Sequence, residues 1–208
     1  NDSTTSKEEI LSETKTSDTN KHPQNEEHLR VLIRIRPPLS PPSASEISPI
    51  SVNGSSGIKL VKETHVFEGD FDQVFDHSSS QQEIFEFLSH NIRRVLDGQN
   101  ASIFAYGQTN TGKTYTMLGP PNTLGLDPDG SISASAGLIP RALCTFFELC
   151  SGAEHINARF ELECSYVQVY NERVLDLLKP GAAVNPNAAE LDIRTGPLGA
   201  VEVVGMVK

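Results

Sequence analysis

The residues best suited to chemistry form one short loop whose spacing fits G-x-x-x-x-G-K-[ST], the pattern of a phosphate-binding loop. Its glycines would let backbone N–H groups turn toward phosphate oxygens, its lysine would reach the terminal phosphates, and its last hydroxyl would ligate Mg²⁺. A following helix would direct its positive end at the same anion. The loop consists of Gly107, Gln108, Thr109, Asn110, Thr111, Gly112, Lys113 and Thr114. It predicts a site for a nucleoside triphosphate with Mg²⁺.

The alternative interpretation is a chance match, in which a glycine turn lies beside a solvated lysine. From average residue usage, such a match would arise in about one sequence of this length in a hundred. The residues before the loop, "ASIFAY" at 101–106, form a short continuous apolar run typical of a strand covered on both faces. Strand, glycine loop and helix is the order that a phosphate-binding loop requires, so the nucleotide site is favoured.

Two helices are predicted on either side of this loop. Ser80-Gln81-Gln82-Glu83 has capping-box spacing, apolar residues then recur at helical intervals as far as Leu96, and Gly98 supplies a C-terminal stop. The second helix is predicted from "GLIPRALCTFFELC" at 137–150. The Pro-, Gly- and Ser-rich residues 118–136 predict a surface loop between the phosphate-binding loop and that helix.

Alternating apolar and polar residues predict the strands. The first, at 29–36, would place Leu29, Val31, Ile33 and Ile35 in the core before Pro37 and Pro38 end it. Residues 57–75 predict short antiparallel strands with a turn at Gly69-Asp70. Residues 158–178 predict one long strand that is buried more deeply at its far end, and a short hairpin is predicted around Gly196-Pro197.

Composition limits the class of protein. Of 208 residues, 37% are hydrophobic and 21% charged, which is ordinary for a globular chain. Residues 1–28 are almost entirely polar and predict a disordered leader. The net charge of −10 disfavours nucleic acid as a partner. With no signal peptide and no apolar run of eighteen residues, we expect a cytoplasmic protein that does not insert into membranes, whose three cysteines are buried free thiols.

The residues around the loop carry a family resemblance. "IFAYGQTNTGKTYTM" at 103–117 resembles the phosphate-binding loop of the kinesin motor family, in which G-Q-T-x-x-G-K-T-x-T-M follows a buried strand ending in A-Y. Further similar segments come in the family's order, and with the closing "VEVVG" they extend the resemblance over residues 29–208. They are "RIRP" at 34–37, "FDQVFDHSSSQQEIF" at 71–85, "GLIPR" at 137–141 and "SYVQVYNERVLDLL" at 165–178.

The resemblance implies a fold and a ligand. The fold would be an α/β P-loop NTPase type, with a predominantly parallel central sheet flanked by helices on both faces. The ligand would be ATP with Mg²⁺, and Thr114 would be the metal ligand. The base would be surrounded by Arg34, Arg36 and Pro37, with Tyr115 at the aromatic position that also touches it. Gln168 stands where the family usually has Glu, which we expect to be tolerated.

The resemblance further implies an ATP-dependent motor whose partner is the microtubule, located in the cytoplasm on the cytoskeleton. The family hydrolyses ATP with two more segments, N-x-x-S-S-R-S-H and D-x-A-G-S-E, and neither occurs in this sequence. Because the chain begins at Asn1 and stops at Lys208, we expect residues 29–208 to be the N-terminal part of a motor domain. Phosphoryl transfer depends on positioned charge and water, so these residues alone should have almost no ATPase activity.

Two other functions compete with the motor. A kinesin-like module could bind microtubules or nucleotide without turnover, and the sequence of the two missing segments would distinguish it from a motor. A different phosphate-loop enzyme, such as a nucleotide kinase, is disfavoured because it has no reason to combine Gln108-Thr109 with the Arg-Ile-Arg-Pro strand and the Tyr170–Glu172 turn. A contact with tubulin around 194–200, which resembles the edge of the family's eighth loop, has weak electrostatic support because that segment has a single arginine.

Overall fold

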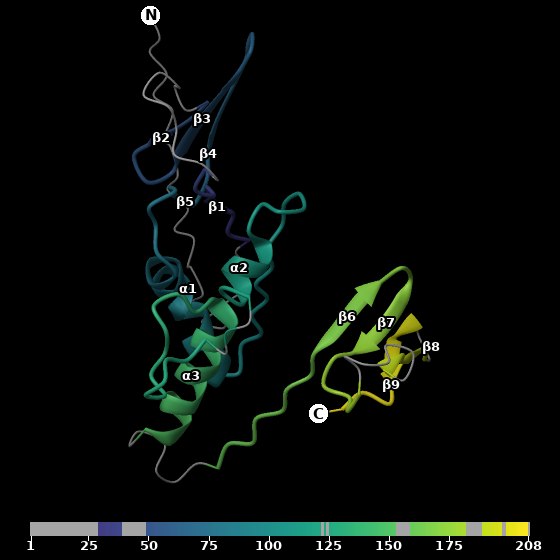
Figure 1. Ribbon diagram of the computed structural model, residues 1–208. Coiled ribbons are helices and arrows are strands. Elements are labelled where there is room, and N and C mark those ends of the chain that lie inside the picture. Colours follow the sequence, from purple (N-terminus) through teal and green to yellow (C-terminus); the bar gives the residue numbers. More distant parts are fainter. Residues whose placement is uncertain are drawn as a thin grey trace, which may run out of the picture. The chain divides into compact units, whose positions relative to one another are not determined.

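The computed structural model describes residues 29–38, 49–121, 123, 125–152, 159–181, 189–196 and 199–207 (Figure 1). The predicted leader at 1–28 lies outside the described residues. The chain forms two compact units. The first contains residues 1–88 and 103–116, and the second contains residues 89–102 and 117–208.

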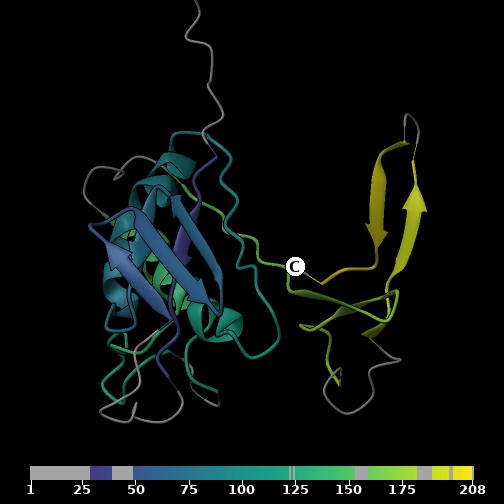
Figure 2. The same ribbon diagram turned by 90° about the horizontal axis from the view of Figure 1, so that it is seen from above.

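The strands of the first unit form two groups. β1 (Leu32–Arg34) pairs in parallel with β5 (Gln73–Phe75). The antiparallel group consists of β2 (Ile50–Asn53), β3 (Gly57–Lys62) and β4 (His65–Asp70), which lie side by side in that order (Figure 2). The short antiparallel strands predicted at 57–75 are therefore confirmed for β3 and β4, whereas β5 in the same stretch pairs in parallel.

Two details of the strand predictions are wrong. The turn between β3 and β4 falls at Glu63-Thr64, where Glu63 has φ 54°, whereas Gly69-Asp70 continues β4 opposite Gly57 and Ile58. The strand expected at 29–36 pairs only over β1, and both Leu29 and Val31 are exposed. The alternating sequence predicted more buried residues than the structure has. The pattern shows which side chains share a face, but it does not show where the neighbouring strand ends.

Helix α1 (Gln81–Leu96) begins with the predicted capping box. The Glu83 carboxylate accepts hydrogen bonds from the Ser80 backbone N–H at 2.7 Å and the Ser80 hydroxyl at 2.8 Å, while the Glu83 N–H donates to that hydroxyl at 3.2 Å. Gly98 has φ 80° just beyond the helix, as a C-terminal stop requires. The helix therefore starts and ends at the signals that its sequence carries.

The first unit buries Val74 and Phe75 of β5 with Ile84, Phe85 and Leu88 of α1. Phe75 also meets Phe87 edge to face, with ring centroids 6.0 Å apart, a favourable geometry for aromatic pairs. This core fixes α1 against β5, and β5 fixes β1.

The expected central strand at 101–106 does not form a strand. The exposed fractions of Phe104 and Tyr106 are 76% and 96%, although the sequence indicated a strand covered on both faces. A strand becomes central only when neighbours pair with both of its edges, and within the described residues no strand pairs with this segment. The apolar run is real, but its packing partners are not among the described strands.

The predominantly parallel sheet is likewise not what the described strands form. β1 with β5 is their one parallel pair, and β2, β3 and β4 pair antiparallel. The pair of β6 (Val167–Tyr170) and β7 (Arg173–Asp176) and the pair of β8 (Asp192–Thr195) and β9 (Val201–Val204) are antiparallel too. The physical reason lies in the connections. Antiparallel neighbours can be joined by a short turn, but parallel neighbours need a long crossover. Most of these strands follow one another after only a few residues.

The second unit contains helix α3 (Leu138–Ser151), which confirms the helix predicted at 137–150. Leu143 and Phe147 of this helix are 42% and 59% exposed, while Leu138 and Arg141 are buried. Part of the preceding loop is held by the backbone bridge between Leu126 and Ile132.

The strand predicted at 158–178 is wrong in form, and its first residue, Ala158, lies outside the described residues. Residues 159–166 lie outside any strand, and the rest folds back as a hairpin of β6 (Val167–Tyr170) and β7 (Arg173–Asp176). Asn171 and Glu172 have φ 49° and 61°, the left-handed pair of a tight hairpin turn. β7 is buried and β6 is exposed. The deeper burial predicted for the far end of one strand is therefore a difference between two strands.

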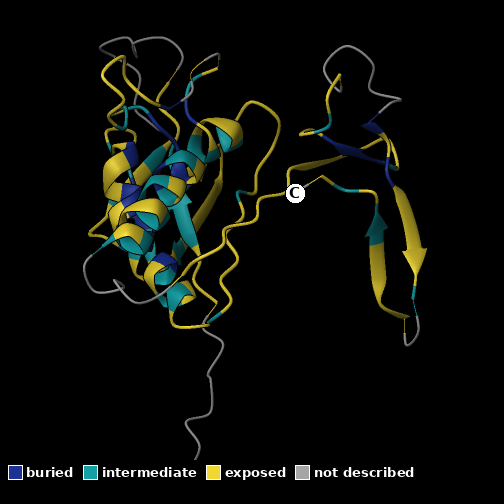
Figure 3. Cartoon of the chain, turned by 90° about the horizontal axis from the view of Figure 1, so that it is seen from below, coloured by how far each residue is buried: buried dark blue, intermediate teal, exposed yellow. Residues whose placement is uncertain are grey.

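The predicted hairpin at the end of the chain is confirmed. β8 (Asp192–Thr195) pairs antiparallel with β9 (Val201–Val204), and Figure 3 shows that most residues of both strands are exposed. The described part of the chain contains no helix long and apolar enough to span a membrane. All three cysteines are free, as predicted, but Cys164 is exposed and Cys144 and Cys150 are only partly buried.

Candidate phosphate-binding site

The backbone of the predicted phosphate-binding loop has the conformation that its glycines allow. Gly107, Asn110 and Gly112 have φ 155°, 68° and 102°. A Cβ atom at Gly107 would lie 2.6 Å from Oγ1 of Thr111, too close for any other residue without a shift of that hydroxyl. The Thr111 hydroxyl donates to the Gln108 carbonyl at 2.8 Å and so closes the loop.

Lys113 lies on the loop itself. Its ammonium donates to the carbonyl oxygens of Gly107 at 2.9 Å and Gln108 at 2.7 Å. Lys113 is the first residue of the short helix α2 (Lys113–Met117), and the next residue, Thr114, is exposed. The lysine ammonium has three N–H donors, which carbonyl or phosphate oxygens can accept. This ammonium, followed by an accessible hydroxyl, is the set of groups expected to bind a triphosphate with Mg²⁺.

The metal needs little from the protein at such a site. Mg²⁺ in phosphate-transfer proteins keeps several waters and is held through the substrate phosphates with one or two side chains. Within the described residues no three His, Cys, Asp or Glu side chains are grouped as a metal site. The single Thr114 hydroxyl fits a metal carried by the nucleotide.

The structure brings Arg34 of β1 to the residues that follow the loop. Its Nη1 donates to the Thr116 hydroxyl at 2.8 Å, and its guanidinium carbon lies 5.2 Å from the centre of the Tyr115 ring. Burial lowers the pKa of Arg34, while the neighbouring Tyr115 raises it. Arginine stays charged under either influence, so the stack presents a cation and an aromatic ring together.

Arg36 is joined to the loop as well, because its Nη1 donates to the Asn110 carbonyl. Pro37 follows Arg36 on the surface and is exposed. The residues predicted from the Arg-Ile-Arg-Pro segment and those predicted from the loop therefore meet in the first unit, although 74 residues separate Arg36 from Asn110.

Sequence reasoning missed Gln81, which belongs to the same cluster. Its amide accepts from Nη1 of Arg34 at 2.9 Å and donates to the Tyr115 carbonyl at 2.6 Å. Gln81 is only 3% exposed, the most buried polar side chain of the first unit's described residues. The capping-box pattern marked its position at the helix start, but no local signal indicates contacts across 34 and 47 residues.

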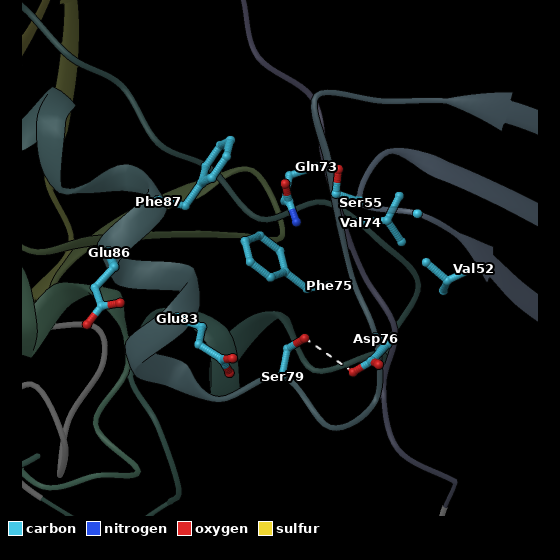
Figure 4. A pocket seen from close by; sticks show the side chains of 11 residues that line it. Val52, Ser55, Gln73, Val74, Phe75, Asp76, Ser79, Glu83, Glu86 and Phe87 are labelled. Carbon is cyan, nitrogen blue, oxygen red and sulfur yellow. Dashed lines mark hydrogen bonds between the residues drawn. The ribbon is translucent and has the colours of Figure 1, made fainter.

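A cavity of about 520 Å³ elsewhere in the first unit, lined by the residues labelled in Figure 4, does not suit a phosphate. Phe75 and Phe87 point toward one another there. The lining also includes three carboxylates, from Asp76, Glu83 and Glu86, and no basic residue. Hydrogen bonds from Ser78 hold the pKa of Asp76 below its ordinary value, and those from Ser80 do the same for Glu83. Both carboxylates are therefore ionised at neutral pH and would repel an anion.

A sequence model described as the kinesin motor domain matches residues 13–208, nearly the whole chain. The chain belongs to the kinesin motor domain family. Among curated kinesins it is 36% identical over 182 residues to kinesin-like protein KIN-14B from Oryza sativa subsp. japonica, covering 86% of this chain and 20% of that protein. It is 37% identical over 180 residues to kinesin-like protein cut7 from Schizosaccharomyces pombe, covering 78% of this chain and 16% of that protein.

Solved kinesin structures give the same result. The motor domain of the Kar3-like kinesin from Ashbya gossypii superposes with a TM-score of 0.64 at 31% identity, covering 86% of this chain and 52% of that one. A fast kinesin superposes with the same TM-score at 29% identity, covering 86% of this chain and 47% of that one. The chain thus shares part of the kinesin motor domain fold, and it spans about a fifth of these curated kinesins and about half of these solved kinesin chains.

Proposed function

We propose that this chain is the nucleotide-binding part of an ATP-driven microtubule motor. The observation that carries the proposal is the arrangement of Lys113 and Thr114 on a glycine loop, with the Arg34–Tyr115 stack beside it. The loop supplies donors for a triphosphate, and the stack supplies a flat cationic and aromatic surface for a base. Membership of the kinesin motor domain family makes ATP the nucleotide and the microtubule the partner that we propose, with a cytoplasmic, cytoskeletal location.

The roles of the side chains follow from their chemistry. Lys113 would exchange its contacts with the Gly107 and Gln108 carbonyls for phosphate oxygens, where a charged acceptor makes a stronger hydrogen bond. Thr114 would bind Mg²⁺, which neutralises charge on the phosphates when it is bound. Arg34, Tyr115, Arg36 and Pro37 would hold the base. In the intact protein we propose that residues 101–106 become a central strand of a predominantly parallel sheet.

The alternative is a kinesin-like module that binds microtubules or nucleotide without hydrolysis. It stays open because the segments N-x-x-S-S-R-S-H and D-x-A-G-S-E, which complete the family's hydrolytic machinery, do not occur in this sequence. Without them we expect residues 1–208 alone to have almost no ATPase activity.

The deciding experiment is microtubule-stimulated ATP turnover by the intact protein, with Lys113→Ala measured in parallel. We expect microtubules to stimulate turnover and the substitution to abolish the stimulated rate, because the phosphates lose their charged donor. Lys179→Ala serves as the control, since that lysine lies in the second unit, far along the chain from the loop. An intact protein that binds microtubules but turns over ATP no faster than Lys113→Ala would establish the non-hydrolysing module instead.

A further inference from the structure

Gln81 connects two segments of the candidate base site that are far apart in the sequence. It is the first residue of α1, and its side chain is 3% exposed. Its Oε1 accepts a hydrogen bond from Nη1 of Arg34 at 2.9 Å, and its Nε2 donates to the carbonyl oxygen of Tyr115 at 2.6 Å. Both polar atoms of the Gln81 amide are therefore hydrogen-bonded, the oxygen to the guanidinium of Arg34 and the nitrogen to the backbone of Tyr115.

The contacts of Arg34 show what this connection achieves. Nη1 donates to Gln81 and also to the Thr116 hydroxyl at 2.8 Å. Within the described residues the hydrogen bonds of Arg34 all use Nη1, so Nε–H and the Nη2 donors remain able to bind a ligand. The guanidinium is thereby fixed along one edge over the Tyr115 ring, 5.2 Å from its centre, with its other edge unused.

We propose that Gln81 is a positioning residue for the nucleotide base. This assignment rests on the proposed function. In it Gln81 does not contact the phosphates. It holds the guanidinium of Arg34 and the backbone of Tyr115 at a set separation, so the cation and ring are in place before the base arrives. Binding then avoids the cost of ordering both side chains, and that gain applies to the base and not to the triphosphate.

Glutamine is the side chain that this position requires. The amide is the neutral group that donates from one atom and accepts at another, and here a donor must meet a carbonyl while an acceptor meets a guanidinium. A carboxylate at the same length would still accept from Arg34, but it would place a negative oxygen against the Tyr115 carbonyl. Asparagine is shorter by one methylene and cannot span the two segments at these distances.

A purely structural role for Gln81 makes a different prediction. If the Gln81 amide only stabilised the start of α1, replacing it would loosen the fold as a whole. The affinity for every ligand of the loop would then fall equally. A positioning role weakens only ligands that carry a base. Comparing ATP with inorganic tripolyphosphate separates the two roles.

The test is equilibrium binding to the intact protein of ATP and of inorganic tripolyphosphate, each with Mg²⁺. For Gln81→Met, which matches the side chain in length and loses both hydrogen bonds, we expect affinity for ATP to fall about tenfold or more. Affinity for tripolyphosphate should stay within about twofold, since the loop is untouched. Gln82→Met is the matched control, because Gln82 is exposed on the adjacent position and contacts Glu86, and it should bind both ligands as the unsubstituted protein does.

Gln81→Glu is a second variant, which tests the proposal even if Gln81→Met fails to fold. It retains the acceptor for Arg34 but places a negative oxygen against the Tyr115 carbonyl, so we expect a loss that is again confined to ATP. Equal losses for ATP and tripolyphosphate in both variants, or no loss for ATP in either, would overturn the assignment. Loss of both ligands in Lys113→Ala with normal ATP binding in both Gln81 variants would overturn the positioning role while leaving the nucleotide site established. An unsubstituted protein that binds neither ligand would overturn the nucleotide site and the Gln81 assignment together.

Discussion

The backbone of Gly137 lies directly against that of Leu118, the residue that follows helix α2. The Gly137 N–H donates to the Leu118 carbonyl at 3.2 Å, and a Cβ atom at Gly137 would lie 2.5 Å from the Leu118 nitrogen and from the carbonyl carbon of Met117. Only a residue without a side chain permits this approach. The glycine that opens α3 therefore anchors the chain just beyond the phosphate-binding loop.

Replacing Gly137 with alanine should strongly destabilise the protein. The atoms that the new methyl group would meet belong to the backbone and cannot rotate away, so the two segments must separate. We expect the free energy of unfolding to fall by about 3 kcal/mol, at the upper end for overpacking substitutions. Urea unfolding of the intact protein measures the change.

Gly196→Ala is the matched control for Gly137→Ala. Its Cβ would meet nothing closer than the Ala200 carbonyl oxygen at 3.5 Å, which is ordinary contact. We expect a change within about 0.5 kcal/mol, as for most surface substitutions. A Gly137→Ala protein as stable as Gly196→Ala would show that the two backbones are not in close contact.

Arg141 holds together the turn that precedes α3. Its side chain is 5% exposed and donates to three backbone carbonyls, through Nε to Ala136 at 2.9 Å and through Nη2 to Ser133 at 3.0 Å and Ala134 at 2.9 Å. Arg141→Met should lower the free energy of unfolding by about 3 kcal/mol, because it removes three hydrogen bonds and leaves the carbonyl of the buried Ala136 without this donor.

Arg141→Lys should recover little of that loss, since one ammonium cannot reproduce the planar fork of the guanidinium. Arg93→Met is the control, because Arg93 is exposed on α1. Thermal unfolding of the four proteins compares them directly. If Arg141→Met and Arg93→Met unfold at the same temperature, the three carbonyls do not depend on Arg141.

Local sequence signals predicted what local interactions decide. The capping box at Ser80 and Glu83 formed as predicted, because it depends on residues only a few positions apart. The burial of residues 101–106 could not be predicted in the same way. An apolar run shows that a segment can be buried, but its actual burial depends on which strands pair with it.

Sequence reasoning named a turn at Tyr170–Glu172, where the structure has one, but it did not predict the β6–β7 hairpin or the contacts of Gln81. Apolar residues alternate as far as Tyr166 and then shift phase to Val167 and Val169, a pattern that fits one long strand. Glutamate is an unusual residue at φ 61°, so its type gives no signal that the chain folds back there. Gln81 meets Arg34 and Tyr115 through tertiary contacts across many residues. A helical pattern shows that Gln81 begins a helix, but it does not show what lies against it.

The capping box also makes a prediction about pH. Hydrogen bonds from the Ser80 N–H and hydroxyl hold the pKa of Glu83 below its ordinary value of 4.5. A carboxylate whose pKa is depressed in the folded state contributes stability above its unfolded value, and the contribution is lost as the pH falls through the folded value. We therefore expect unsubstituted protein to be more stable than Glu83→Gln at pH 7 and the difference to vanish in acid, below the depressed pKa of Glu83.

Ser80→Ala tests the other half of the box. It should lower the free energy of unfolding by about 1 kcal/mol, the usual cost of removing a helix cap, whereas Ser80→Thr keeps a hydroxyl and should lose far less. Urea unfolding at pH 7 and pH 3 measures all four proteins. Because the amide of Glu83→Gln cannot titrate, a stability gap between it and the unsubstituted protein that is the same at both pH values would show that ionised Glu83 does not stabilise the start of α1.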